Sequence, residues 1–163
     1  MTNNLYSASK LYKYAIDYLS KFSSSKKNLE IILKNKIRRL KIEKKDKFLL
    51  YNTINKIIND LEKNNYINDQ NFTSSKIRTY TCQGKSRIFI KKYLLQKGVS
   101  QNIISKNLDD LDNLNYNWEF ESAKIFARKK RLLENSTDKE KNLSKMARAG
   151  FSYSISKKIL DEI

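Results

Sequence analysis

Apolar residues recur along this chain at the spacing of one face of an α-helix. In the segment from about 46 to 64 the residues expected to point inward are Leu50, Ile54, Ile57, Ile58 and Leu61. The same period predicts further helices at about 11–19, 23–40, 69–84, 86–98, 100–114, 118–133, 140–150 and 152–163. No segment shows the pattern of a strand, so the chain is predicted to be all-α.

Polar residues and glycines mark the ends of these predicted helices. The expected N-terminal caps are Ser24 or Ser25, Asn68 or Asp69, Ser100, Asn117, and Thr137 in a capping box with Glu140. Gly98 is predicted to end one helix in a left-handed turn, and Gly150 to end another. The segment 41–47 is interpreted as a basic linker. Proline is absent and only three glycines occur, so little else interrupts a helix.

Position within the period also assigns further side chains to the interior. These are Leu11, Tyr14, Ala15, Tyr18, Leu19, Leu29, Ile32, Leu33, Ile37, Tyr66, Ile88, Leu94, Leu95, Ile103, Ile104 and Leu108. Cys82 is interpreted as a small buried or half-buried hydrophobe, and a single cysteine excludes an internal disulfide. Tyr80 and Tyr93 are left open as residues that could stack on unpaired bases.

An internal repeat organises the second half of the chain. The segment "KGVSQNIISKNLDDL" aligns with "AGFSYSISKKILDEI" at an offset of 52 residues, which pairs Gly98 with Gly150. A fainter copy without the glycine covers the end of the first third. The fold is therefore predicted to be an elongated array of three tandem three-helix repeats, at 1–65, 66–116 and 117–163. Trp118 is expected to pin the junction between the second and third repeats.

The charge of the chain points to a polyanionic partner. Lys and Arg number 34 against 17 Asp and Glu, which gives a formal net charge of +17. Such an excess favours nucleic acid, with a membrane surface or an acidic protein assembly as alternatives. Many of these lysines could instead only solvate helix faces, and the abundance of Lys, Asn and Ile also suits an AT-rich coding sequence.

The basic residues gather in the segment 34–41, in the central repeat and in the segment 128–131. In each place a row of cations could follow a phosphate backbone without reading bases. Lys34, Arg38 and Lys41 are expected to share one helical face. The predicted partner- or DNA-binding residues are Lys34, Arg38, Arg39, Arg78, Lys85, Arg87, Lys91, Lys92, Lys97, Arg128, Lys129, Lys130 and Arg131.

The sequence offers little material for catalysis. Histidine is absent, which removes histidine general bases and, with one cysteine, the usual zinc sites. No glycine-rich phosphate loop occurs. Asp109 and Asp112 would share a helical face and could be imagined as a metal pair, but a solvated face near a repeat junction is the preferred interpretation. A small nuclease or other enzyme is therefore a third-ranked hypothesis, and no metal, cofactor or catalytic residue is predicted.

The segment "QKGVSQNIISKNL" at 96–108 has the pattern of a helix-turn-helix. The alternative function is accordingly a sequence-specific transcription factor, which would dimerise and bind spaced half-sites. The copy of this segment 52 residues further on favours a structural element instead. Binding by it would then fall to Lys97 and Lys106.

Four segments in order resemble the RecX family, the bacterial regulators of the recombinase RecA. They are "YAIDYLSKFSSSKKNLEIIL" at 14–33, "LEKNNYINDQNF" at 61–72, "GKSRIFIKKYLLQKGVSQNII" at 84–104 and "KMARAGFSYSISKKIL" at 145–160. The second repeat is the most specific, with Asp69 and Phe72 followed by Gly84, Arg87, Ile88, Leu95 and Gly98.

The resemblance implies a non-catalytic regulator that lies along the RecA filament on single-stranded DNA and inhibits its ATPase and strand exchange. It implies a role in homologous recombination, DNA repair and the SOS response, with a basic concave surface toward the filament. The first residues lack the pattern of a signal peptide and no membrane span is expected, so a cytoplasmic location is predicted. A monomer is predicted because the repeats supply their own neighbours.

Overall fold

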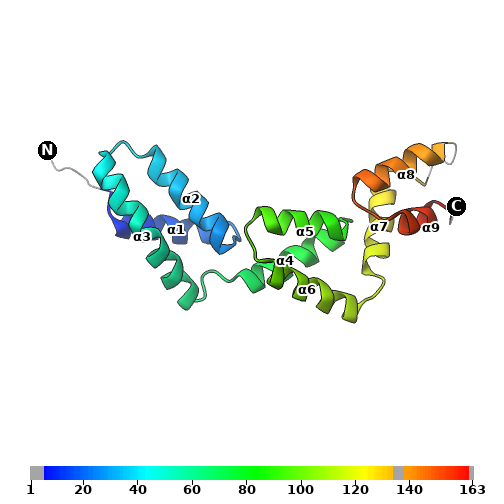
Figure 1. Cartoon of the computed structure of the whole chain (residues 1–163), viewed down its shortest axis with the longest axis horizontal. Coiled ribbons are helices and arrows are strands. Elements are labelled where there is room, and N and C mark those ends of the chain that lie inside the picture. The colour runs from blue at the N-terminus through cyan, green and yellow to red at the C-terminus, as the bar shows by residue number, and fades with distance from the viewer. Residues whose placement is uncertain (1–5, 134–137, 162–163) are drawn as a thin grey trace. The chain divides into compact units, whose positions relative to one another are not determined.

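A computed structural model of the chain describes residues 6–133 and 138–161. Within these ranges it contains nine α-helices and no strand (Figure 1). The helices are α1 (Ala8–Leu19), α2 (Lys26–Arg39), α3 (Lys44–Lys63), α4 (Asp69–Cys82), α5 (Arg87–Gln96), α6 (Gln101–Leu114), α7 (Trp118–Lys129), α8 (Lys139–Arg148) and α9 (Tyr153–Asp161). The prediction of an all-α fold is confirmed.

The described residues form two compact units. The N-terminal unit comprises 6–72 together with the short turn Lys97–Val99. The C-terminal unit comprises Thr73–Gln96 and the described part of 100–161. The turn that holds Gly98 thus belongs with helices that precede it by many residues.

The core of the N-terminal unit is built from one apolar stripe on each of its first three helices. All five residues predicted inward on α3 are buried. They pack with Leu11 and Ala15 of α1 and with the α2 stripe of Leu29, Leu33 and Ile37. Full burial of one such aliphatic side chain stabilises the fold by about 1.5–3 kcal/mol, so this cluster is the main source of stability in the unit.

The C-terminal unit buries Ile90 and Leu94 of α5 and Ile104 and Leu108 of α6. Its last three helices enclose a second cluster: Ala123, Ala127, Leu132, Met146, Phe151, Ile159 and Leu160. Small residues on α7 let α9 approach closely, and the rings of Phe126 and Phe151 pack at 5.5 Å between centroids.

Three predicted interior residues are exposed instead. Ile88 and Leu95 are 65% and 44% exposed, because α5 turns Ile90 and Leu94 inward. Tyr66 is 54% exposed, since it follows Asn65, whose positive φ of 58° ends α3. Cys82 is exposed as well, because it is the last residue of α4, where the helix leaves the core.

Some predicted boundaries also differ. The segment 41–47 is not a linker throughout, because α3 begins at Lys44. Lys41 lies beyond the C-cap Leu40 and so does not extend the face of α2. Asn117 makes no side-chain cap bond, and its backbone N–H instead donates to the Asn115 side chain at 3.1 Å. The predicted capping box falls partly outside the described residues, at Thr137.

The remaining end signals act as predicted. Ser25 caps α2, Asn68 caps α4 through N–H groups of the first turn, and Ser100 caps α6. Gly98 and Gly150 have φ values of 73° and 91°, the left-handed region that glycine enters without steric cost.

Candidate functional site

The start of α2 forms a junction with later parts of the N-terminal unit. The Ser25 hydroxyl, fully buried, accepts from the Asn28 N–H at 3.1 Å and donates to the carbonyl oxygen of Lys97. The backbone N–H of Lys26 donates to the Asp69 carboxylate at 2.8 Å, and its ammonium group pairs with Glu62 at 2.9 Å. We call this set the first junction.

Glycine closes the first junction. A Cβ atom at Gly98 would overlap the Cβ and Cγ atoms of Lys27, so only a residue without a side chain allows the turn to reach α2. The Lys97 ammonium group, in turn, donates to the Asn28 side chain at 3.2 Å. The turn at Gly98 is therefore a packing element.

The start of α5 makes the same contacts inside the C-terminal unit. The buried Ser86 hydroxyl accepts from the Phe89 N–H at 3.2 Å and donates to the Ala149 carbonyl at 2.6 Å. The Arg87 N–H donates to the Glu119 carboxylate at 2.9 Å. A Cβ atom at Gly150 would lie 2.6 Å from the Ser86 hydroxyl oxygen. We call this set the second junction.

The two junctions correspond position by position. A serine caps the helix and binds the carbonyl before a glycine, a basic residue follows it, and a carboxylate from a later helix accepts that residue's N–H. Sequence alignment found the two glycines, and Ser25 was predicted only as a helix cap. Its bond to the Gly98 turn was missed, and Ser86 was missed altogether. These serines lie 61 residues apart rather than 52, so one fixed offset does not align both halves of the junction.

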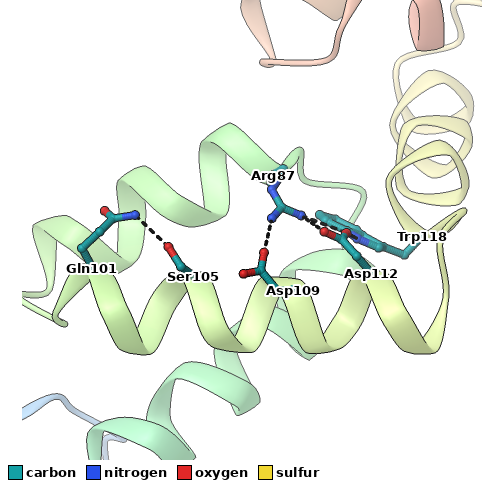
Figure 2. A network of polar contacts seen from close by, with 6 residues as sticks. All are labelled: Arg87, Gln101, Ser105, Asp109, Asp112 and Trp118. Carbon is teal, nitrogen blue, oxygen red and sulfur yellow. Dashed lines mark hydrogen bonds and ion pairs between the residues drawn. The ribbon is translucent and has the colours of Figure 1, made fainter.

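Figure 2 shows the charged part of the second junction, where the guanidinium of Arg87 meets two carboxylates of α6. One guanidinium nitrogen lies 2.7 Å and 2.9 Å from the Asp112 oxygens, and the other lies 3.2 Å from Asp109. The Trp118 indole N–H donates to Asp112 at 2.7 Å. Trp118 thus links α6 to α7.

This arrangement changes the interpretation of Arg87. Two carboxylates surround one guanidinium, so the local charge is not positive, and the donors of Arg87 are directed at side chains of its own unit. Asp109 and Asp112 do share a face, and that face serves the ion pair. The described residues contain no group of three or more His, Cys, Asp or Glu that could hold a metal ion.

Most of the other predicted basic residues are exposed, and some of the set also contact neighbouring groups. The exposed residues are Lys34, Arg38, Arg39, Arg78, Lys91, Lys92, Arg128, Lys129, Lys130 and Arg131. Lys34 pairs with Glu30 one turn earlier, and the Lys129 ammonium group donates to the Gln83 carbonyl at 3.1 Å. Lys85 lies over the Phe89 ring at 4.7 Å.

Within the C-terminal unit, Arg78 of α4 and Lys91 and Lys92 of α5 remain the exposed cations of the central region. On the same two helices the rings of Tyr80 and Tyr93 meet edge to face at 4.8 Å, and Tyr80 also contacts Phe89. Both tyrosines are half-buried, so each has a packing role whether or not it also contacts a base.

One group of residues was missed by the sequence patterns. In the N-terminal unit, Lys36 of α2 lies over the rings of Tyr6 and Tyr14 and lines a pocket with Arg39. Only Arg39 was in the predicted set. The signal was present, because Lys36 lies one turn after Ile32, on the side of α2 that faces α1.

Together these features define a class of protein: a basic, all-α protein whose helices are joined by repeated junctions and carry exposed cations. Comparison with curated proteins identifies regulatory protein RecX of Myxococcus xanthus, which is 28% identical over 155 residues, covering 90% of this chain and 82% of that protein. Regulatory protein RecX of Clostridium botulinum strain Eklund 17B is 33% identical over 146 residues, or 82% of this chain and 66% of that protein.

Solved structures agree with this result. The crystal structure of RecX from Lactobacillus salivarius is 31% identical, with a TM-score of 0.69 over 95% of both chains. A second crystal structure of regulatory protein RecX, 22% identical, shares the fold with a TM-score of 0.67. No family model matches the sequence. The chain belongs to the RecX family, whose members are regulatory proteins and not enzymes.

Among the helices in the part of the chain that the structure describes, none is both long enough and apolar enough to cross a bilayer.

Proposed function

We propose that this chain binds the filament of RecA on single-stranded DNA and inhibits its ATPase and strand exchange. The observation that carries the proposal is the exposure of most of the predicted cations on helices whose opposite faces are packed. Lys91 and Lys92 are exposed on α5, at positions between the buried Ile90 and Leu94. A rigid helix thus presents charge toward a polyanionic partner, which favours sequence-independent contact with phosphates or with acidic protein groups.

The recurrence of the junction supports the further proposal that the chain is built of three-helix repeats. Each junction joins the second helix of one proposed repeat, at 1–65 or 66–116, to the next repeat. Repeats joined in this way pack against one another within a single chain. No second chain is then needed to cover them, which favours a monomer. Since RecA acts on the chromosome, we also propose a cytoplasmic site of action.

A sequence-specific transcription factor is less well supported. Ile104, Asn107 and Leu108 of the candidate recognition helix α6 are buried. The exposed side of α6 carries Asp109 and Asp110, and carboxylates at that place would face the phosphates of a DNA groove.

The direct test is a RecA ATPase and strand-exchange assay on single-stranded DNA with this protein titrated in. Inhibition below one copy per RecA protomer is expected if the protein caps or spans the filament. The charge-removal variant Lys91→Ala with Lys92→Ala should shift the inhibition curve to higher concentration. The absence of any effect of the unmodified protein at stoichiometric amounts would refute the proposal.

A further inference from the structure

A small pocket in the N-terminal unit lies between α1 and α2. Its volume is about 250 Å³, and its lining residues are Tyr14, Ile32, Asn35, Lys36, Arg39 and Leu40. This is below the roughly 300–1,000 Å³ of sites that hold a whole drug-sized ligand. The apolar side chains Ile32 and Leu40 line part of the pocket, and the polar groups are one amide, one phenol and two cations. No lining residue is acidic.

Lys36 is held in a fixed position at this pocket. Its ammonium nitrogen lies 4.8 Å from the centre of the Tyr14 ring and 5.8 Å from that of Tyr6. Such cation–π contacts contribute about 0.5–1 kcal/mol at exposed sites and more where water is excluded. A free lysine carries about 2 kcal/mol of rotamer entropy, so a lysine that is already positioned loses less of it when it binds an anion.

The Tyr6 phenol stays uncharged beside this lysine. Burial, and to a lesser extent the neighbouring Tyr14, raises the pKa of Tyr6 above its ordinary value of 10.0. The Tyr6 hydroxyl lies 3.5 Å from the Lys10 carbonyl and donates to it. The rings therefore orient the cation without neutralising it, which leaves its charge available to a ligand.

The surroundings add to the positive charge. The segment "KNKIRRLK" at 34–41 contains five basic residues and no acidic one. Three of them, Lys36, Arg38 and Arg39, lie in the last turn of α2. Part of that charge compensates the negative end of the helix dipole, which is equivalent to about half an elementary charge, so a clear excess remains.

We propose that this pocket binds a single phosphate group, with Lys36 and Arg39 as its cationic contacts and the Asn35 amide as a further donor. The inference deepens the proposed function and rests on it for the source of the phosphate, which is a backbone phosphate of single-stranded DNA. The same chemistry would also accept a phosphate of a free nucleotide, so both sources are tested.

The test uses the full chain and compares two variants of equal charge change. Lys36→Gln with Arg39→Gln removes the two pocket cations, and Lys13→Gln with Lys21→Gln removes two exposed cations elsewhere in the same unit. Affinity for a fluorescent oligothymidylate is measured at several salt concentrations. The pocket variant should bind at least tenfold more weakly, with a salt slope reduced by about 0.7, since the pocket holds one phosphate and each phosphate contact on a single strand contributes about 0.7.

Equal weakening by the two variants would show a general charge effect and overturn the proposal. Lys36→Arg separates binding from folding, because it keeps the charge and should retain affinity, and circular dichroism confirms that each variant is folded. Competition with inorganic tripolyphosphate examines the second source. If the pocket variant lost tripolyphosphate binding but kept its affinity for the oligonucleotide, the site would be a phosphate site for free ligands, and its assignment to the DNA backbone would be wrong.

The RecA assay keeps this inference distinct from the proposed function. If the unmodified protein inhibits RecA but the pocket and control variants bind DNA equally well, the phosphate site is refuted and the regulatory role stands. If the pocket variant alone loses DNA binding but the unmodified protein does not inhibit RecA, the phosphate site stands and the regulatory role is refuted.

Discussion

The Ser86 hydroxyl donates to the carbonyl oxygen of Ala149 across 2.6 Å, although 63 residues separate them in the chain. The same hydroxyl accepts the N–H of Phe89 and so caps α5. One buried oxygen thus ends a helix and fixes a distant turn at once. Ser25 does the same with Asn28 and Lys97 in the other unit.

Ser86→Ala is therefore expected to destabilise the protein more than the loss of an ordinary cap. The change removes a cap worth about 1 kcal/mol and leaves the Ala149 carbonyl without this donor, at a further cost of about 1–3 kcal/mol. Ser100→Ala is the matched control, because Ser100 is exposed and caps α6 alone. Urea unfolding of both variants measures the difference. Equal losses would mean that the bond to Ala149 contributes nothing.

Gly98→Ala should be among the most destabilising small substitutions. It places a side chain at a φ of 73° and pushes its methyl group into Lys27. The left-handed conformation alone costs roughly 1–2 kcal/mol for a residue with a Cβ atom. Combining it with Lys27→Gly removes the overlap but not the backbone strain, so a double-mutant cycle should show partial rescue. Additive effects would show that the two residues do not meet.

Arg87→Ala and the pair Lys91→Ala with Lys92→Ala should separate stability from binding. Arg87 is one-third exposed and bound to two carboxylates, so its removal should lower the unfolding free energy by about 1 kcal/mol. Exposed Lys91 and Lys92 should change stability by less than about 0.5 kcal/mol. Thermal unfolding combined with filament binding tests this. The assignment of Arg87 to the junction fails if its variant is as stable as the unmodified protein.

Arg131→Gly should raise stability even though it removes a charge from the basic segment 128–131. Arg131 has a positive φ of 52°, the conformation that Gly84 and Gly150 adopt after α4 and α8. Glycine relieves the strain, while its greater freedom in the unfolded chain offsets part of the gain, so an increase of up to about 1 kcal/mol is expected. Lys130→Gly, without a positive φ, is the control and should not stabilise. Calorimetry distinguishes the two.

Glu30 should make the stability of the N-terminal unit depend on acid pH. Hydrogen bonds from Lys27 and Lys34 hold the pKa of the Glu30 carboxyl below its ordinary value of 4.5. A lowered folded-state pKa means that the contribution is present above the unfolded pKa and is lost as pH falls through the folded value. The stability difference between the unmodified protein and Glu30→Gln should therefore shrink below about pH 4. A difference that stays constant from about pH 6 to about pH 3 would contradict this.

The face of α5 shows where sequence patterns stop being decisive. Apolar residues occupy most of this helix, from Ile88 and Phe89 through Ile90 to Leu94 and Leu95. More than one face of it therefore satisfies a helical period, and the sequence placed Leu94 correctly but Ile88 and Leu95 wrongly. The partner helices select Ile90 and Leu94, which leaves Ile88 exposed next to the turn at Gly150.

Arg87 illustrates the same limit for the candidate site. In the sequence it is one cation among many near "KSRIFIKK", and charge alone assigns it to a phosphate. Its partners Asp109 and Asp112 lie 22 and 25 residues away, on another helix. The spacing that identifies a shared face within one helix carries no information about which other helix that face meets.

The sequence by itself determined the helices, most of their caps, the two glycine turns of the repeated segment and the excess of positive charge. Each of these follows from local spacing or from composition, which do not depend on how distant segments pack against one another. Only the tertiary structure decided that Ser25 meets Lys97, that Arg87 is bound by carboxylates and that Lys36 lies over two tyrosine rings. Those relationships depend on packing between helices far apart in the chain, where several apolar faces compete and only the folded arrangement selects one.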